Sequence, residues 1–428
     1  MAINSHSWYK LDNAAKIYPA IMSDKRTSTF RISAILYEVI DPEILQKALC
    51  AVKDRFPTLF VTIRKGLFWY FFEPNNAEPI VWPETTCPCR VINRHENNGY
   101  LFKVYYYDKR ISVECFHSLT DGSGVKEFLK TLIYQYLSFK GYDVDCEDLV
   151  KVPYSHPSKQ EIEDSFINYY DKKNVVGRDE PLAEHIEGIP FEDEGLNIIH
   201  GILSASKLNT YAKSQGMTIT IYLASLLIYA IYEENMKYGN YHNPIKLSIP
   251  VNLRKIFPSQ TMRNFASYIN VGVMPTHTLT MEAVVRNVTE QLKEGVKKQN
   301  LYPRINANVK SEKHPVVRGI PLVLKNIVLR EVGNRFGERL ITSTLSNLGV
   351  VKVPKSMEEH IDYFTFILPS AAPNPLNLAV CSFNDKLSIN FSRSITEPNI
   401  IRNFFRTLVK DTGLDVRIYS NDWGLPYA

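Results

Sequence analysis

His117 and Asp121 lie four residues apart in the stretch Phe116-His-Ser-Leu-Thr-Asp-Gly122. A neutral imidazole is the side chain best suited to accept a proton near neutral pH, so His117 is a candidate general base. The spacing alone is a weak signal, because a histidine at the end of a strand is more often a satisfied structural residue. No third metal ligand lies nearby, and the chain has neither a G-x-S-x-G nucleophile elbow nor a Walker loop. The sequence therefore predicts no metal site.

The surrounding pattern indicates how this pair is positioned. Residues 111–115 alternate between apolar and polar side chains, which is typical of a half-buried strand, and His117 falls on the apolar face. Gly122 and Gly124 interrupt the strand, and apolar residues then recur at helical spacing from 125 to 137. The predicted element is a strand, a tight turn and a helix, a scaffold rigid enough to fix a catalytic base.

The composition is that of a soluble globular protein, with 45% hydrophobic and 22% charged residues in a chain of 428. No apolar run reaches the length of about 18 residues that a membrane span requires, so we expect none. The N-terminus lacks a basic segment followed by an apolar one, and the six cysteines are scattered, so we expect reduced thiols and a cytoplasmic protein. A net charge of +5 without a basic run gives no support for nucleic-acid binding.

The first part of the chain predicts an α+β fold with largely antiparallel strands. Asp41-Pro42 is a helix start, and Lys65-Gly66 is the turn of a hairpin over residues 61–72. A strand over residues 101–107 should pair with the strand that precedes His117. The polar, proline-containing segment 141–195 is the predicted boundary between an N-terminal lobe, residues 1–175, and a C-terminal lobe, residues 176–428.

The second part of the chain continues the alternation of strands and helices. The patterns predict strands at 198–203, 245–251, 266–273 and 340–345, helices at 206–214, 218–236, 281–298 and around 400–408, and a hairpin of residues 376–383 and 386–392. The strand at 340–345 should end in a turn at Ser346-Asn-Leu-Gly349. The helix at 218–236 is apolar on nearly all of its faces and should be buried in the core.

Three further stretches add to the histidine motif. They are the helix with Arg55-Phe-Pro57, the segment Ser248-Ile-Pro-Val-Asn-Leu-Arg254 followed by Asn264-Phe265, and Thr344-Leu-Ser-Asn-Leu-Gly349. In this order they resemble the CoA-dependent acyltransferase superfamily, which includes chloramphenicol acetyltransferase, the plant BAHD acyltransferases and nonribosomal peptide condensation domains. The likeness is greatest to bacterial alcohol acetyltransferase-like proteins. Two departures stand out: Phe116 replaces the first histidine of the family motif His-His-x-x-x-Asp-Gly, and the Asp-Phe-Gly-Trp-Gly motif of the plant branch is absent.

The resemblance implies two chloramphenicol-acetyltransferase-like lobes, each with a mixed, largely antiparallel sheet flanked by helices. It implies acetyl transfer from acetyl-CoA, a co-substrate rather than a bound cofactor, to a small-molecule alcohol or amine. His117 would be the base, and Asp121 would pair with Arg254 and hold the turn. The oxyanion would be met by Ser346-Asn347, by the backbone N–H of Gly122 or near Asn264, and we expect a monomer.

Other interpretations of these residues stay open at this point. Arg254 is equally an ordinary surface charge, Ser346-Asn347 is equally turn chemistry, and Asn264 is equally a cap for local backbone. Two alternative functions also stand beside acyl-CoA chemistry. One is a condensation-type enzyme that takes its acyl group from a carrier-protein thioester. The other is a non-catalytic binding module, an alternative that stays open because Phe116 replaces the first histidine of the motif.

Overall fold

The predicted strand–turn–helix element is present in the computed structural model. The strand β7 (Arg110–Phe116) ends one residue before His117, and the helix α3 (Gly122–Phe139) begins directly after Asp121. The Asp121 carboxylate caps α3 by accepting hydrogen bonds of 3.0 and 3.3 Å from two backbone N–H groups of the first turn. These groups have no partner inside the helix, so the cap fixes where α3 starts.

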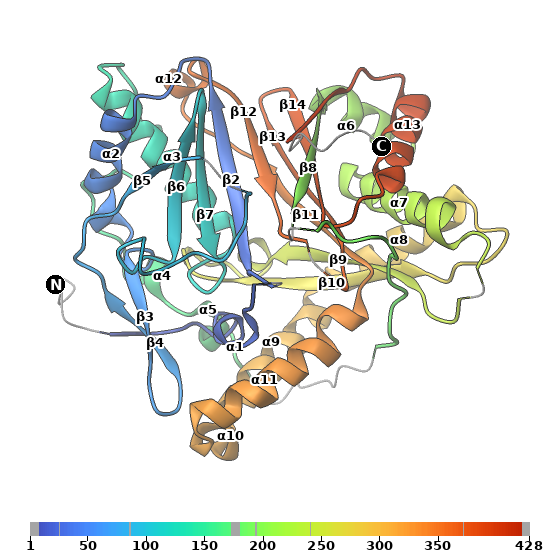
Figure 1. The fold of residues 1–428 in the computed structure, drawn as a ribbon, viewed down its shortest axis with the longest axis horizontal. Coiled ribbons are helices and arrows are strands. Elements are labelled where there is room, and N and C mark those ends of the chain that lie inside the picture. The colour runs from blue at the N-terminus through green and yellow to red at the C-terminus, as the bar shows by residue number, and fades with distance from the viewer. Residues whose placement is uncertain are drawn as a thin grey trace.

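The structure describes residues 8–24, 26–84, 87–172, 180–192, 195–239, 241–370 and 372–421. The predicted lobe boundary between residues 175 and 176 lies outside these ranges and stays a prediction. Two larger sheets and one small sheet form the described part of the chain. With helices packed on mixed, largely antiparallel sheets, the fold is α+β, as predicted (Figure 1).

The first large sheet carries β7 at its centre. In order, its strands are β12 (Ile361–Ile367), β2 (Thr29–Leu36), β7, β6 (Phe102–Tyr107) and β5 (Val81–Pro83). All neighbours are antiparallel except β5 and β6. β12 comes from late in the chain, so the polypeptide crosses back to complete the sheet that holds His117 (Figure 1).

The second large sheet is built entirely from residues after 196. In order, its strands are β10 (Ala266–Val273), β9 (Ile245–Asn252), β11 (Ser343–Val350), β13 (Leu376–Phe383), β14 (Lys386–Arg393), β8 (Asn197–Ser204) and β15 (Arg417–Ser420). β11 runs parallel to both of its neighbours, and the other pairs are antiparallel. Its core includes the helices α7 (Ile219–Ile231), α8 (Met281–Gly295) and α13 (Asn399–Thr412).

The remaining elements are short or peripheral. A small sheet contains β1 (Tyr9–Lys10), β4 (Tyr70–Pro74) and β3 (Val61–Lys65), and the other helices are α1 (Tyr18–Ile21), α2 (Pro42–Ala51), α4 (Lys159–Ile162), α5 (Ser165–Asn168), α6 (Ala205–Ser214), α9 (Lys298–Lys313), α10 (Pro315–Gly319), α11 (Leu322–Phe336) and α12 (Lys355–Glu358). Among the described residues no single helix is long and apolar enough to cross a membrane, although the bent pair of α6 with 219–236 meets the length and composition criteria.

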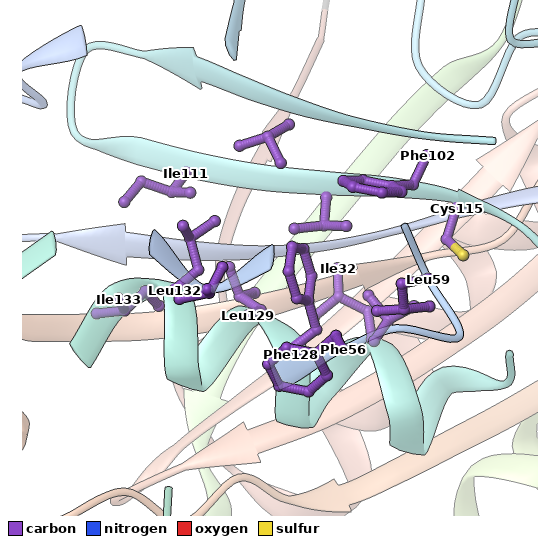
Figure 2. Packing of buried hydrophobic residues seen from close by; sticks show 14 of the residues in the cluster. Ile32, Phe56, Leu59, Phe102, Ile111, Cys115, Phe128, Leu129, Leu132 and Ile133 are labelled. Carbon is purple, nitrogen blue, oxygen red and sulfur yellow. The ribbon is translucent and has the colours of Figure 1, made fainter. Parts of the chain in front are cut away.

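The core of the first sheet lies between its strands and α3. Figure 2 shows Phe128, Leu129 and Leu132 of α3 among side chains of β2 and β7, such as Ile32 and Ile111. All five are buried to 1% exposure or less. Burying a side chain of this size contributes about 1.5–3 kcal/mol relative to leaving it exposed, so α3 is anchored firmly behind the histidine motif.

The prediction that β7 is only half-buried is wrong. Glu114, on the face expected to be polar and solvated, is 2% exposed, and its carboxylate lies 2.8 Å from Arg31 of β2. The segment with Cys87 and Cys89 packs with residues at the start of β8 and covers this face: Cys89 donates its backbone N–H to Glu114. A strand between two packed layers is buried on both faces, and its charges must then be paired.

Two further differences concern the region after residue 298. The sequence of 299–339 gave no prediction, yet it forms α9, α10 and α11. The predicted turn at 346–349 lies instead inside β11, whose register shifts between Asn347 and Val350. Gly349 there has a φ of +76°, so the residues that signal a turn produce a bulge within the strand.

Candidate active site

A cavity of about 440 Å³ lies where the two large sheets meet. His117 and Gly122 line it from the first sheet and the start of α3. Asn252 at the end of β9 and Ser346 on β11 line it from the second sheet. Because both sheets contribute to the wall, the cavity exists only in the folded two-sheet arrangement.

His117 is held firmly on the cavity wall. Its backbone N–H donates to the carbonyl oxygen of Ser28 at 2.8 Å. Its ring stacks on Tyr18, with centroids 4.6 Å apart and an interplanar angle of 15°, and contacts Phe30 at 5.0 Å. The Nδ1 atom lies 3.1 Å from Oδ1 of Asn264. These contacts leave the imidazole one orientation.

A hydrogen-bonded chain behind the ring sets its tautomer. Asn264 donates from Nδ2 to Oδ2 of Asp12 at 3.1 Å, so its Oδ1, which only accepts, faces His117. Nδ1 of His117 must then be the protonated nitrogen, and Nε2 keeps a free lone pair. Asp12 is fully buried and is itself fixed by the backbone N–H of Ala15 at 2.7 Å. The chain Asp12–Asn264–His117 therefore presents a basic Nε2.

The environment keeps this imidazole neutral. Burial lowers the pKa of His117 below its ordinary value of 6.5 and outweighs its own backbone carbonyl, Asp121, Asn264 and Asp12, which all favour the charged form. A histidine whose pKa lies below its usual range is unprotonated near neutral pH. It can therefore accept a proton there.

Asp121 lies in a different network, in which both of its carboxylate oxygens already accept hydrogen bonds. Its Oδ2 accepts from Nη1 of Arg254 at 2.8 Å and from the backbone N–H of Phe265 at 2.9 Å, while Oδ1 caps α3. Burial alone would raise the pKa of Asp121, but the Arg254 guanidinium and these hydrogen bonds lower it overall. The carboxylate is charged and structural.

Arg254 extends this network to the loop that carries Asn264. Arg254 lies in the short helix Leu253–Lys255 after β9 and donates from Nε to the carbonyl oxygen of Thr261 at 2.9 Å and from Nη2 to that of Arg263. The Asp121–Arg254 pair thus joins the first turn of α3 to residues 261–265. Because Asn264 is part of this loop, the pair positions the partner of His117.

Gly124 makes the close approach of this loop possible. A Cβ atom at Gly124 would lie 2.0 Å from Oγ1 of Thr120 and 2.5 Å from the carbonyl oxygen of Met262. Real Cβ atoms do not approach other heavy atoms this closely, so a side chain here would push α3 and the loop apart.

The residues predicted for the oxyanion divide into two groups. Ser346 and Asn347 line the cavity together with Gly122. The side-chain amide of Asn347 already makes hydrogen bonds within the protein: Nδ2 donates to Thr220 at 3.0 Å, and Oδ1 accepts from the N–H of Gly349 at 2.8 Å. Asn264 is 2% exposed and donates to Asp12, so the oxyanion role does not fit its geometry and it acts on Nδ1 of His117 instead.

Two residues at the site were not predicted. Asp12 and Tyr18 come from the N-terminal segment, and Asp12 reaches Asn264 across 252 positions of sequence. Nothing local distinguishes Asp12 from a surface aspartate. Among the described residues, no group of three or more His, Cys, Asp or Glu side chains is placed to hold a metal ion.

Replacing Asn264 with Asp is expected to move the acid limb of the kcat/KM profile to higher pH by about 1–2 units, because a carboxylate beside Nδ1 favours the imidazolium. A pH–rate profile of the variant against wild type checks this. Asn264→Leu, which removes the acceptor without adding charge, should lower kcat without that shift. An unchanged profile in Asn264→Asp would contradict the contact.

Comparison with known proteins places this chain in a family. The model of the alcohol acetyltransferase family matches residues 125–406, about two thirds of the chain, and begins just after the His117 motif. A search of curated proteins found no match.

Solved structures share the fold. Polyketide synthase associated protein 5 from Mycobacterium tuberculosis is 11% identical, with a TM-score of 0.58 over 94% of this chain and 97% of that one. Trichothecene 15-O-acetyltransferase from Fusarium sporotrichioides is 10% identical, with a TM-score of 0.59 over 95% of each chain. The starter condensation domain of rhizomide synthetase, solved with C8-CoA and Leu-SNAC, is 14% identical, with a TM-score of 0.59 over 95% and 94%. The chain therefore belongs to the alcohol acetyltransferase family, within the fold shared by CoA-dependent acyltransferases and condensation domains.

Proposed function

We propose that this acyltransferase moves an acetyl group from acetyl-CoA to an alcohol or an amine, with His117 as the general base. The observation that carries the proposal is the neutral imidazole on the cavity wall, whose Nδ1 is bound to Asn264. An alcohol or amine is a weak nucleophile until its proton is accepted, and Nε2 is the atom available for that transfer.

The proposed reaction has two steps. Nε2 of His117 takes the acceptor proton as the acceptor oxygen or nitrogen attacks the thioester carbonyl, which gives a tetrahedral oxyanion. The carbon–sulfur bond then breaks, and the thiolate of CoA takes the proton back from the imidazolium. Proton and electrons balance, and no acyl-enzyme forms.

Two groups on the cavity wall suit the oxyanion. Gly122 is the first residue of α3, so its N–H lies at the positive end of a helix, and Ser346 lines the same cavity. Donors aimed at a developing oxyanion in a water-poor site are worth more than in solution. This geometry supports Gly122 and Ser346 in that role.

The cavity also suits a small, largely apolar acceptor. Its volume of about 440 Å³ lies within the range common for small-molecule sites, and Ile17, Ile21, Ile341 and Leu368 contribute apolar wall. The neighbour solved with C8-CoA supports a CoA thioester as the donor.

Release of free thiol from acetyl-CoA, measured with a panel of alcohols and amines, tests the proposal. We expect turnover with at least one apolar alcohol or amine and none without an acceptor. Turnover only from an acyl carrier protein would favour the condensation-type alternative. Binding of acetyl-CoA without turnover on any acceptor would favour the binding module.

A further inference from the structure

The helix α11 presents an apolar face to solvent. Val323, Leu324, Ile327 and Val328 are 75%, 56%, 63% and 56% exposed. Their spacing places them on one side of the helix, while Lys325, 3% exposed, lies on the opposite, packed side. Soluble proteins seldom leave a contiguous apolar face uncovered without a function for it.

This face continues onto neighbouring elements. At the tip of the β3–β4 hairpin, Leu67 is 72% and Phe68 is 40% exposed. The hairpin contacts α11 directly, since Leu322 donates its N–H to the Leu67 carbonyl at 2.8 Å and Lys325 donates from Nζ to the Phe68 carbonyl at 2.9 Å. Figure 1 shows the hairpin, α10 and α11 together at one end of the molecule.

We call this surface the apolar tip. It consists of Leu67, Phe68, Val316, Val323, Leu324, Ile327 and Val328. Figure 1 shows that α10 and α11 project from the body, so the apolar tip lies on a protruding part of the molecule.

Positive charge surrounds the apolar tip. The exposed cations on α9 to α11 include Lys310, Lys313, Arg318 and Arg330. Of the two acidic residues in the same span, Glu312 is bound by Lys16 and by Nδ2 of Asn13 at 2.7 Å, and Glu331 is exposed beside Arg330. The surface therefore carries a positive charge that complements anionic headgroups.

We propose that the apolar tip docks peripherally on an anionic lipid surface. An exposed apolar helix face bordered by Lys and Arg is the pattern of helices that lie in the headgroup region. Basic side chains add attraction to anionic leaflets, and this attraction is screened by salt. The inference does not depend on the proposed acyl transfer.

Docking would bring the catalytic cavity close to the lipid. Gly333 of α11 and Ile21 of α1 line that cavity. Gly333 lies five to ten residues along the same helix from the exposed face, about 8–15 Å at the helical rise. The helix that would contact the lipid thus also forms part of the cavity wall.

Vesicle flotation tests the proposal with the full chain. We expect wild type to float with vesicles of phosphatidylcholine mixed with phosphatidylglycerol, and much less with phosphatidylcholine alone or at high salt. The double variant Val323→Glu/Ile327→Glu should bind at least about tenfold more weakly. Lys313→Glu/Arg318→Glu should bind both vesicle types equally weakly.

Val39→Glu is the matched control, because Val39 is 60% exposed and lies outside the apolar tip. It should bind as wild type does. Failure of wild type to float with anionic vesicles, or unchanged binding by Val323→Glu/Ile327→Glu, would overturn the proposal. So would vesicle-free sedimentation in which wild type is dimeric and Val323→Glu/Ile327→Glu is monomeric, since the tip would then be an interface between copies.

Discussion

His117→Ala is expected to lower kcat/KM for acyl transfer by about 10²- to 10⁴-fold, the usual contribution of a positioned general base. The variant loses Nε2, the only group assigned to take the acceptor proton. The proposed acyl-CoA site and the proposed oxyanion donors should be unaffected. Thiol release under saturating acetyl-CoA measures the loss.

The matched control is His95→Ala. His95 is exposed and does not line the cavity, so this change should leave the rate of thiol release unaltered. The ring of His117 is partly exposed to the cavity, and its removal should leave the fold intact. A folded His117→Ala protein that turns over at the wild-type rate would contradict the assignment of the base.

Asp121→Ala is expected to lower the free energy of unfolding by about 3–5 kcal/mol, because it leaves the charge of Arg254 poorly solvated and unpaired. The two side chains are 7% and 13% exposed, and their charged atoms lie 2.8 Å apart. Loss of the α3 cap adds about 1 kcal/mol. Urea denaturation followed by circular dichroism measures the change.

Two controls separate the buried pair from a generic loss of charge. Glu73→Ala removes a partner of Arg64 at the same distance of 2.8 Å, but that pair is 60% and 41% exposed and should contribute about 0–1 kcal/mol. Asp121→Ala/Arg254→Met should be less destabilised than the sum of the single changes. An Asp121→Ala protein with full stability and full activity would contradict the structural pair.

The same pair predicts a pH dependence of stability. The folded pKa of Asp121 is below its ordinary value, so the unfolded state binds its proton first as the pH falls. The ionised Asp121 stabilises the folded state fully at pH values above its unfolded-state pKa of about 3.9. This stabilisation is lost as the pH falls through the lower pKa that Asp121 has in the folded state. Wild type should therefore lose stability more steeply than Asp121→Asn in this acid range.

Local signals were sufficient to predict the element that carries the chemistry. The signals are the alternation in 111–115, the glycines after Asp121 and the apolar spacing of α3. All of them lie within thirty residues, and they predict β7, the turn and α3 correctly. The helix start at Asp41-Pro42 is confirmed for the same reason, since a cap is a contact between near neighbours.

Long-range contacts escaped prediction. The burial of Glu114 depends on a layer formed by distant residues, and the place of β12 beside β2 depends on a crossover late in the chain. Asp12 reaches Asn264 only in three dimensions, so no spacing could reveal it. The helix α11 is a different case: Val323, Leu324, Ile327 and Val328 recur at helical spacing, so a local signal for this helix is present in the sequence although no helix was predicted there.

The central claim is a neutral His117 with a free Nε2, and ¹⁵N NMR of the imidazole nitrogens tests it most directly. The resonances are assigned by their loss in His117→Gln and followed as a function of pH. We predict a protonated Nδ1 and an unprotonated Nε2 near neutral pH, with a pKa below 6.5. An imidazolium at neutral pH, or a proton on Nε2 in the neutral form, would contradict the account.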